Sequence, residues 1–272
     1  MNRQKFPFAL LLLSFVMILS FLSCQSSGDP SSSDENEQII RLFNGENLDG
    51  WYIYLKGYGK NNDPNQVFTV ADGMIRITGE DWGSIVTEEE YENYHLIAEF
   101  KWGGPTHEPR KDRARDCGLL LHSVGEDGAW SDTWMYSIEA NIIEGGTGDF
   151  IVVGDKSENF SITSPVAEEK QGGSWIFQDG GKLETIHSGR INWWGRDPGW
   201  KDTLGFRGSQ DVEHPVGEWN KIECIAQGDS IIVLLNDLVV NKAFDVKPSK
   251  GRIQIQSEAA EIYFRRVDLR PL

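Results

Sequence analysis

Residues 137–144 combine a carboxylate and an amide in a pattern suited to acid–base chemistry. In the run SIEANIIE, Glu139 and Asn141 alternate with apolar residues, so both side chains would lie on one side of a strand. A carboxylate in such a place can act as a general base or bind a metal ion. A solvated or salt-bridged glutamate would give the same pattern. We interpret Glu139 as the first candidate for a base and Asn141 as a neighbouring substrate-binding residue.

Further titratable residues flank this run in the sequence. His122 ends the run CGLLLH and titrates near neutral pH, although a lone histidine often has a structural role. Glu144 and Asp149 flank the turn EGGTGDF, where they could reach a metal ion or cap the turn. We expect His122 and Glu144 as catalytic partners of Glu139. The candidate ligands for a divalent metal of unknown identity are Glu139, Asp149 and His107, which lies in a polar segment.

Other side chains have the chemistry of substrate binding. Arg115 could hold an oxyanion, or it could only neutralise nearby acids. Trp193 and Trp194 could stack on the face of a sugar, or they could fix their loop to the core. We also expect polar positions of the predicted strands to bind substrate. These positions are Glu99, Lys101, Gln254 and Gln256.

Short strand-like runs separated by turn signals must position these residues. The runs are 67–70, 74–78, 95–102, 117–122, 136–144, 220–226, 230–236, 252–256 and 261–269. In HLIAEFKW, Ala98, Phe100 and Trp102 alternate with Glu99 and Lys101. This period of two predicts an all-β sandwich of two antiparallel sheets with long loops. The polar positions are either a plain solvated face or the lining of a concave sugar-binding groove, and we favour the groove.

The composition limits the possible partners. The 272 residues carry a formal charge of −16, so the chain is a poor candidate for gripping nucleic acid through its phosphates. Cys117 and Cys224 are the cysteines that follow Cys24. They could pair in an oxidising compartment, or they could be two separate buried thiols, which we favour.

The first residues read as an export signal. Arg3 and Lys5 precede an almost wholly apolar run over residues 6–22, which is followed by Ser23 and Cys24. The segment resembles a bacterial lipobox, which implies a signal peptide at 1–23 and a lipid on Cys24. An uncleaved membrane anchor is the alternative. Residues 24–38 contain a polar stretch and are expected to form a flexible tether before a single domain at 39–272. We expect a lipid-anchored protein of the outer membrane, periplasmic or surface-exposed, that touches membrane only through this lipid.

Five segments resemble the 3-keto-disaccharide hydrolase domain family. They are LFNGENLDGW (42–51), YHLIAEFKW (94–102), DCGLLLH (116–122), GEWN (217–220) and the closing GRIQIQSEAAEIYFRRVDLRPL (251–272). The sequence departs from the family pattern at Asp116 and Cys117, where Asn-Ser is usual, and at His122, where Arg is common. The regions 103–116 and 145–215 also look longer than in small members.

This resemblance implies a concanavalin A-like jelly roll that cleaves glycosides oxidised to a ketone at C3. Such a ketone acidifies the hydrogen on C2, so a base can remove it and the group on C1 leaves by elimination. Water addition would make the net reaction a hydrolysis. The expected partner is therefore an oxidised glycoside or disaccharide. Two alternatives stay open: a non-catalytic carbohydrate-binding lipoprotein, and a retaining laminarinase-like glycosidase, whose E-x-D-x-x-E signature Glu139 to Glu144 faintly resembles.

Overall fold

Strands with alternating apolar side chains build the fold. The computed structural model describes residues 39–272, so the predicted signal peptide, the tether up to residue 38 and the lipid on Cys24 lie outside the described residues. The nine predicted runs are all observed as strands, with ends that differ by at most four residues. The described residues contain no α-helix, and therefore none that is long and apolar enough to cross a membrane.

The strands form two sheets, which we call the β9 sheet and the β15 sheet. In spatial order, the β9 sheet contains β12 (Trp175–Ile176), β14 (Gly189–Asn192), β10 (Phe150–Val153), β9 (Tyr136–Ile143), β8 (Asp116–Val124), β18 (Arg252–Ser257), β6 (Gly83–Thr87), β2 (Trp51–Leu55) and β3 (Gly59–Lys60). All of its neighbouring pairs are antiparallel except β12 with β14.

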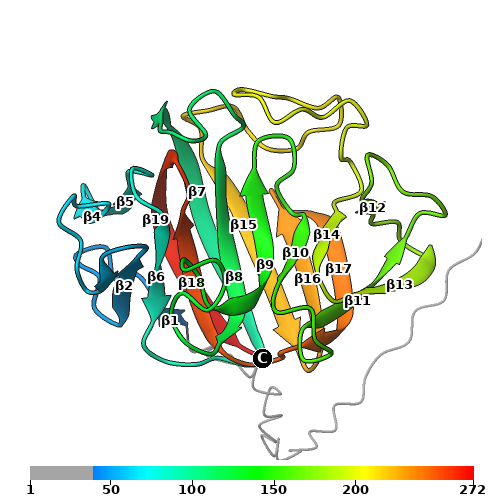
Figure 1. Cartoon of the computed structure of the whole chain (residues 1–272), viewed down its shortest axis with the longest axis horizontal. Helices are drawn as coiled ribbons and strands as arrows, with labels where there is room; N and C mark the ends of the chain where they lie inside the picture. Colours follow the sequence, from blue (N-terminus) through cyan, green and yellow to red (C-terminus); the bar gives the residue numbers. More distant parts are fainter. Residues whose placement is uncertain (1–38) are drawn as a thin grey trace, which may run out of the picture. The chain divides into compact units, whose positions relative to one another are not determined.

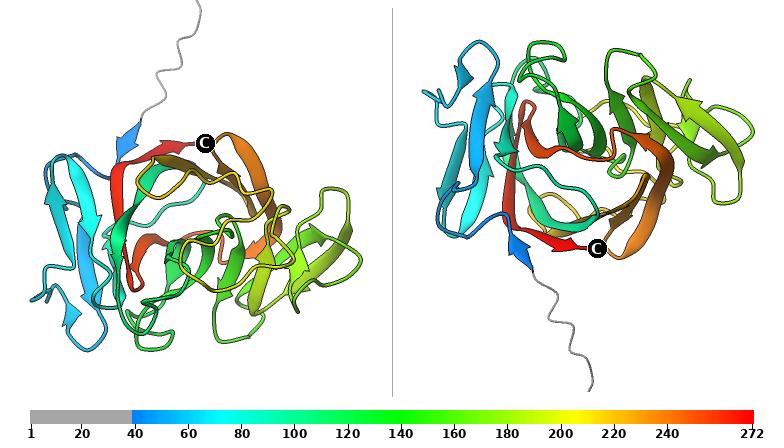
Figure 2. Two further views of the ribbon diagram at one scale, coloured as in Figure 1. Left: turned by 90° about the horizontal axis from the view of Figure 1, so that it is seen from above. Right: turned by 90° about the horizontal axis from the view of Figure 1, so that it is seen from below.

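The β15 sheet packs behind it. Its order is β13 (Lys182–Ile186), β11 (Ser161–Val166), β17 (Leu238–Lys247), β16 (Ser230–Leu235), β15 (Asn220–Gln227), β7 (Tyr94–Thr106), β19 (Ala260–Pro271), β5 (Met74–Ile77) and β4 (Phe68–Ala71), with β1 (Ile40–Arg41) paired to β19. The end-on views show the two sheets facing each other around the core (Figure 2). The predicted jelly-roll sandwich is confirmed.

The hydrophobic core lies between the sheets. Ala98, Phe100 and Trp102 of β7 point into it from one side, while Ile138 and Ile142 of β9 point into it from the other, each nearly or fully buried. The alternate residues of each strand consequently face away from the core. The long connections after β14 run over one end of β9 and β10 (Figure 1). They cover part of the outer face of the β9 sheet and bury its polar side chains.

Cys117 and Cys224 are separate buried thiols, as favoured from the sequence. The Cys117 Sγ atom lies 3.3 Å from the Gln256 backbone oxygen, on the core side of the β9 sheet. Burial raises the pKa of Cys117 well above its ordinary value, so this thiol stays protonated and inert. Both cysteines therefore act as small core residues.

Candidate functional site

The register of the β9 sheet brings Glu139 and Asn141 into one polar surface on its outer face. Glu139 lies opposite Leu120 of β8 and Ile151 of β10, and Ile151 in turn lies opposite Arg190 of β14. Adjacent strands are about 4.8 Å apart, so Glu139 and Arg190 stand about 10 Å apart at the backbone on the same face. Their long side chains can therefore share one site.

Gly118 leaves the space in which the Glu139 carboxylate lies. A Cβ atom on Gly118 would fall 2.4 Å from Glu139 Oε1 and 2.6 Å from Gln256 Oε1. The Gln256 oxygen is buried and makes no hydrogen bond within the described part of the chain. Asn141 Nδ2 donates to Glu139 Oε1 at 2.9 Å. The structure thus brings together three of the predicted residues: Glu139, Asn141 and Gln256.

Glu139 is held in its neutral form at neutral pH. Burial, reinforced by the negative charge of Asp116, raises its pKa to about 8. The charge of Arg190 and the hydrogen bond from Asn141 oppose this shift without cancelling it. A carboxyl group with this pKa can donate a proton near neutral pH, whereas an ordinary glutamate is ionised there.

Asp116 is the second carboxylate of the surface. Its Oδ1 accepts a hydrogen bond from Asn141 Nδ2 at 3.0 Å, and its Oδ2 lies 2.9 Å from Arg110 Nη2. Burial raises the pKa of Asp116, while the charge of Arg110 works in the opposite direction. The neighbouring Glu258 has a pKa raised well above its ordinary value by burial and by the charge of Asp116. Arg110 therefore favours the charged form of Asp116, and burial favours the neutral form of Glu258.

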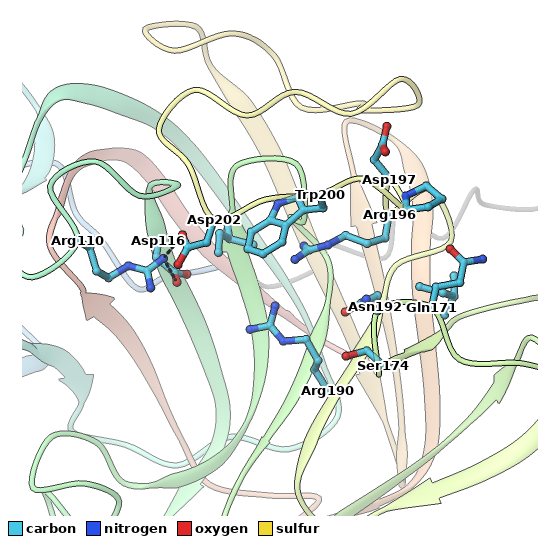
Figure 3. A pocket seen from close by; sticks show the side chains of 14 residues that line it. Arg110, Asp116, Gln171, Ser174, Arg190, Asn192, Arg196, Asp197, Trp200 and Asp202 are labelled. Atoms are coloured by element: carbon cyan, nitrogen blue, oxygen red, sulfur yellow. Dashed lines mark hydrogen bonds and ion pairs between the residues drawn. The ribbon is translucent and has the colours of Figure 1, made fainter.

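A pocket of about 310 Å³ opens beside Asp116 (Figure 3). This size is near the lower end of small-molecule sites, about 300–1,000 Å³. Figure 3 shows Arg190 pointing into the space between Asp116 on one side and Asn192 on the other. The side chains and backbone around it belong to Arg110, Asp116, Ile143, Gln171, Gly172, Ser174, Ile176, Arg190, Asn192, Arg196, Asp197, Pro198, Trp200 and Asp202. We call this space the Arg190 pocket.

Asp149 anchors the arginines of the pocket instead of binding a metal ion. Its fully buried carboxylate lies 3.2 Å from Arg190 Nη1 and 2.9 Å from Arg196 Nη1, and it accepts a hydrogen bond from the Trp193 backbone nitrogen at 2.8 Å. The two guanidinium groups occupy one of its oxygens and the Trp193 backbone nitrogen occupies the other, so neither oxygen is left for a cation. Asp149 therefore does not fit the predicted metal site. Within residues 39–272, no group of three or more His, Cys, Asp or Glu side chains is arranged to hold a metal ion.

The predicted catalytic residue Glu144 braces two loops. It forms a buried ion pair with the predicted binding residue Arg115, with 2.7 Å between Arg115 Nη1 and Glu144 Oε1. Its other oxygen accepts hydrogen bonds from the backbone nitrogens of Arg115 and Gly205. Glu139 and Glu144 consequently do not face a common groove as a pair, so the arrangement needed for the laminarinase-like alternative is not formed by these two residues.

His122 also lies apart from Glu139, and His107 makes a backbone hydrogen bond from its nitrogen to the Ala259 oxygen. The His122 ring packs edge-on against Tyr94 of the β15 sheet at 5.6 Å, and its Nδ1 lies 2.9 Å from the Pro248 oxygen. Burial lowers the pKa of His122 to about 4, so it is neutral at pH 7. An irregularity in the pairing of β8 between Leu121 and Val124 turns the ring away from the outer face. The run of residues 117–122 gave no sign of this irregularity in the sequence.

Two predicted binding residues belong to the other sheet. Glu99 and Lys101 lie on the outer face of β7, behind the core. Glu99 pairs with Arg265 and Arg266, and the Lys101 ammonium lies over the Trp219 ring at 5.0 Å. The prediction that they share a face with Glu139 is wrong, because a period of two separates core from surface without telling which sheet a strand joins.

The remaining predicted residues have structural contacts. Gln254 accepts a hydrogen bond from Ser84 and donates one to Ser123, so its buried amide is satisfied. Trp193 is buried in the core. Trp194 is 38 % exposed, and its indole nitrogen donates to the Val239 oxygen. Trp193 therefore fixes its loop, as one of the two interpretations held.

Several pocket residues were missed in the sequence. Arg190 and Asn192 lie two apart on β14, which is the spacing of side chains on one strand face. Asp116 attracted notice only as a departure from the family pattern. Arg110, Arg196 and Trp200 lie on irregular segments, where spacing alone does not predict orientation.

The fold and the site define a jelly-roll protein of the concanavalin A-like class, with a polar pocket on the outer face of one sheet. Residues 38–270 match the profile of the 3-keto-alpha-glucoside-1,2-lyase-like domain. The chain belongs to this family, which confirms the resemblance seen in the sequence. The family supports a carbohydrate-active function.

Solved structures share the fold at low sequence identity. A protein from Parabacteroides distasonis, provisionally assigned as a glycosyl hydrolase, has a TM-score of 0.51 at 17% identity, covering 86% of this chain and 94% of that chain. A second such protein from the same organism has a TM-score of 0.49 at 20% identity, covering 86% and 100%. The carbohydrate-binding module CBM66 from Bacillus subtilis has 0.42 at 14%, covering 81% and 95%. No curated protein matches the sequence.

Proposed function

We propose that this chain is an enzyme that cleaves 3-keto-glycosides or 3-keto-disaccharides. The base removes the proton on C2, the group on C1 leaves, and water addition gives net hydrolysis. The observation that carries this proposal is the pair of carboxyl groups around Asn141. Glu139 and Asp116 each have an oxygen within 3.0 Å of Asn141 Nδ2, and burial raises the pKa of both, but only Asp116 forms an ion pair with an arginine, Arg110, which works against that rise. Different environments for two neighbouring carboxyl groups support acid and base roles.

Asp116 takes the role of the base in this proposal, in place of the Glu139 expected from the sequence. It lines the Arg190 pocket, whereas Glu139 lies beneath it and carries a proton at neutral pH. Arg110 lies 2.9 Å from the Asp116 carboxylate. The ketone carbon C3 is bonded to C2, so a guanidinium beside the base is also beside the oxygen on which enolate charge develops.

Glu139 takes the role of the acid whose proton passes through water to the departing oxygen. Its proton is present at neutral pH because its pKa is raised to about 8. Asn141 orients both carboxyl groups through the same amide nitrogen. The proton leaving C2 goes to Asp116, and the proton reaching the leaving group comes from Glu139, so the cycle closes when the two exchange protons through water.

One assay tests the function. Purified protein is given a 3-keto-glucoside and its unoxidised parent, each with and without a chelator. We expect cleavage of the keto-glucoside alone. Cleavage of the parent alone would contradict the keto-sugar chemistry, and binding without cleavage of either would favour a carbohydrate-binding protein.

The proposal includes export and attachment by a lipid on Cys24, which would hold the enzyme at the outer membrane. The support is the basic start, the apolar run and Ser23-Cys24. Metabolic labelling with a radioactive fatty acid tests this, since label should enter the wild-type chain and be absent from Cys24→Ala. Equal labelling of both chains would refute the attachment site.

A further inference from the structure

One end of the Arg190 pocket carries positive charge that the proposed reaction does not use. Arg190 and Arg196 both form ion pairs with Asp149, through the same oxygen atom. One carboxylate balances one guanidinium group, so this pair of arginines keeps one positive charge in excess. Arg190 has 29% of its side chain exposed and points into the pocket (Figure 3), whereas Arg196 is nearly buried beside Trp200. The excess charge is therefore accessible at Arg190.

The other carboxylates that line the pocket have partners of their own. Asp116 and Asp202 both lie within 3.3 Å of Arg110 Nη2. Asp197 accepts hydrogen bonds from the backbone nitrogens of Gly199 and Ser209, and Figure 3 shows it pointing away from Arg190. The surrounding acids consequently leave the guanidinium of Arg190 open to an anion from outside.

Asn192 gives an independent sign of a ligand at the same end. It is 94% buried, since only 6% of its surface is exposed, and its Oδ1 has no hydrogen-bond partner within the described residues. An unsatisfied buried carbonyl costs about 1–3 kcal/mol unless a ligand or water donates to it. Gln171 and Ser174 line the pocket beside it (Figure 3). A hydroxyl group of a sugar would satisfy Asn192.

We propose that this end binds a sugar ring bearing an anionic substituent, a carboxylate or a sulfate ester, on Arg190, with a hydroxyl donating to Asn192. The placement of that ring rests on the proposed function. If C2 and C3 lie at Asp116 and Arg110, a pyranose turns C5 and its substituent C6 toward the opposite end of the pocket. An anion on C6 then meets Arg190 in a charge-assisted hydrogen bond. The substrate class is thus an acidic glycoside.

Isothermal titration calorimetry with unoxidised sugars tests this without requiring any cleavage. The full-length wild-type protein is titrated with glucuronate, glucose 6-sulfate and glucose at low salt. We expect at least tenfold tighter binding of one or both acidic sugars than of glucose. The sugar that binds more tightly identifies the carboxylate or the sulfate ester as the anion. Asn192→Ala should weaken all three sugars and keep the ratio between acidic and neutral ones.

The matched variants are Arg190→Gln, Arg190→Lys and Arg41→Gln. Arg190→Gln should abolish the preference for acidic sugars, Arg190→Lys should keep part of it, and Arg41→Gln should leave it unchanged because Arg41 is exposed on β1 of the other sheet and does not line the pocket. Thermal unfolding checks that each variant folds. Equal binding of glucose and both acids by the wild type, or an unchanged preference in folded Arg190→Gln, would overturn the inference. Failure to cleave any 3-keto-glycoside would instead count against the proposed function.

Discussion

The amide nitrogen of Asn141, Nδ2, contacts two carboxyl groups: it lies 2.9 Å from Glu139 Oε1 and 3.0 Å from Asp116 Oδ1. An amide nitrogen has two hydrogens to donate, so one residue can orient both carboxyl groups. The two acids come from neighbouring strands, β8 and β9, and each has a different environment. Burial is the largest influence on the pKa at both residues, but at Asp116 the charge of Arg110 works against it. Their different electrostatic environments follow from this placement.

Asp116→Asn should remove the base while preserving the shape of the site. We expect kcat/KM for a 3-keto-glycoside to fall by about 10²–10⁴-fold, which is the usual contribution of a general base. The melting temperature, measured by circular dichroism, shows whether the fold survives. Asp112→Asn is the matched control, because Asp112 is exposed in the loop that precedes β8 and should keep wild-type kinetics. Full activity in Asp116→Asn would remove this residue from the mechanism.

Activity should fall as the pH rises through about 8. The pKa of Glu139 is raised to about 8, so above that pH the carboxyl group loses the proton that it must donate. The measurement is kcat against pH from 5 to 10. Glu139→Gln should lose activity and should show no such decline in what remains. A wild-type rate that stays flat from pH 7 to 10 would contradict the acid role.

The same ionisation should make stability depend on pH. A carboxyl group whose pKa is higher in the folded state than in the unfolded chain binds more protons when folded, so its contribution to stability is fully present below about pH 4.5 and is lost as the pH rises to about 8. Urea unfolding between pH 5 and 9 should therefore show Glu139→Gln gaining stability relative to wild type as the pH rises. A constant difference across this range would argue against the raised pKa.

Gly118→Ala should disturb the site more than the fold. The added Cβ would lie 2.4 Å from Glu139 Oε1, so the carboxyl group must move. We expect about 1–3 kcal/mol of destabilisation from overpacking and at least a tenfold loss in kcat. Gly104→Ala is the control, since no heavy atom lies within 4 Å of its Cβ position. Equal kinetics for the two variants would show that the space left by Gly118 does not matter for catalysis.

Arg115→Leu should destabilise the whole domain. It would leave the buried Glu144 carboxylate without its ion pair, and breaking a buried pair in this way typically costs 3–5 kcal/mol. For a domain of this size we expect the melting temperature to fall by roughly 6–20 °C. Arg113→Leu removes an exposed arginine two residues away and should change it little. A small change in both would indicate that Glu144 is satisfied by its backbone hydrogen bonds alone.

The sequence predicted the fold more fully than the site. Alternation along β7 and β9 identified the residues that face the core, because burial imposes the same period on every strand of a sandwich. It could not assign Glu99 and Glu139 to different sheets, since that assignment depends on the order in which distant strands pair. The predicted Asn141 and Gln256 lie beside Glu139 because β8, β9 and β18 are neighbours. The positions of Arg110 and Arg196 in the site could not be predicted from the sequence, because the packing of loops orients their side chains.

The position of the last two strands has a consequence for how the protein is made. β18 pairs between β8 and β6, and β19 pairs between β7 and β5, so the last two strands each fill a gap in one sheet. While residues 252–271 are still inside the ribosome, both sheets lack an interior strand, and Gln256 and Glu258 are not yet in place beside Glu139 and Asp116. Folding should therefore wait until residues 252–271 have left the ribosome. Nascent chains that stop before residue 250 should remain sensitive to protease.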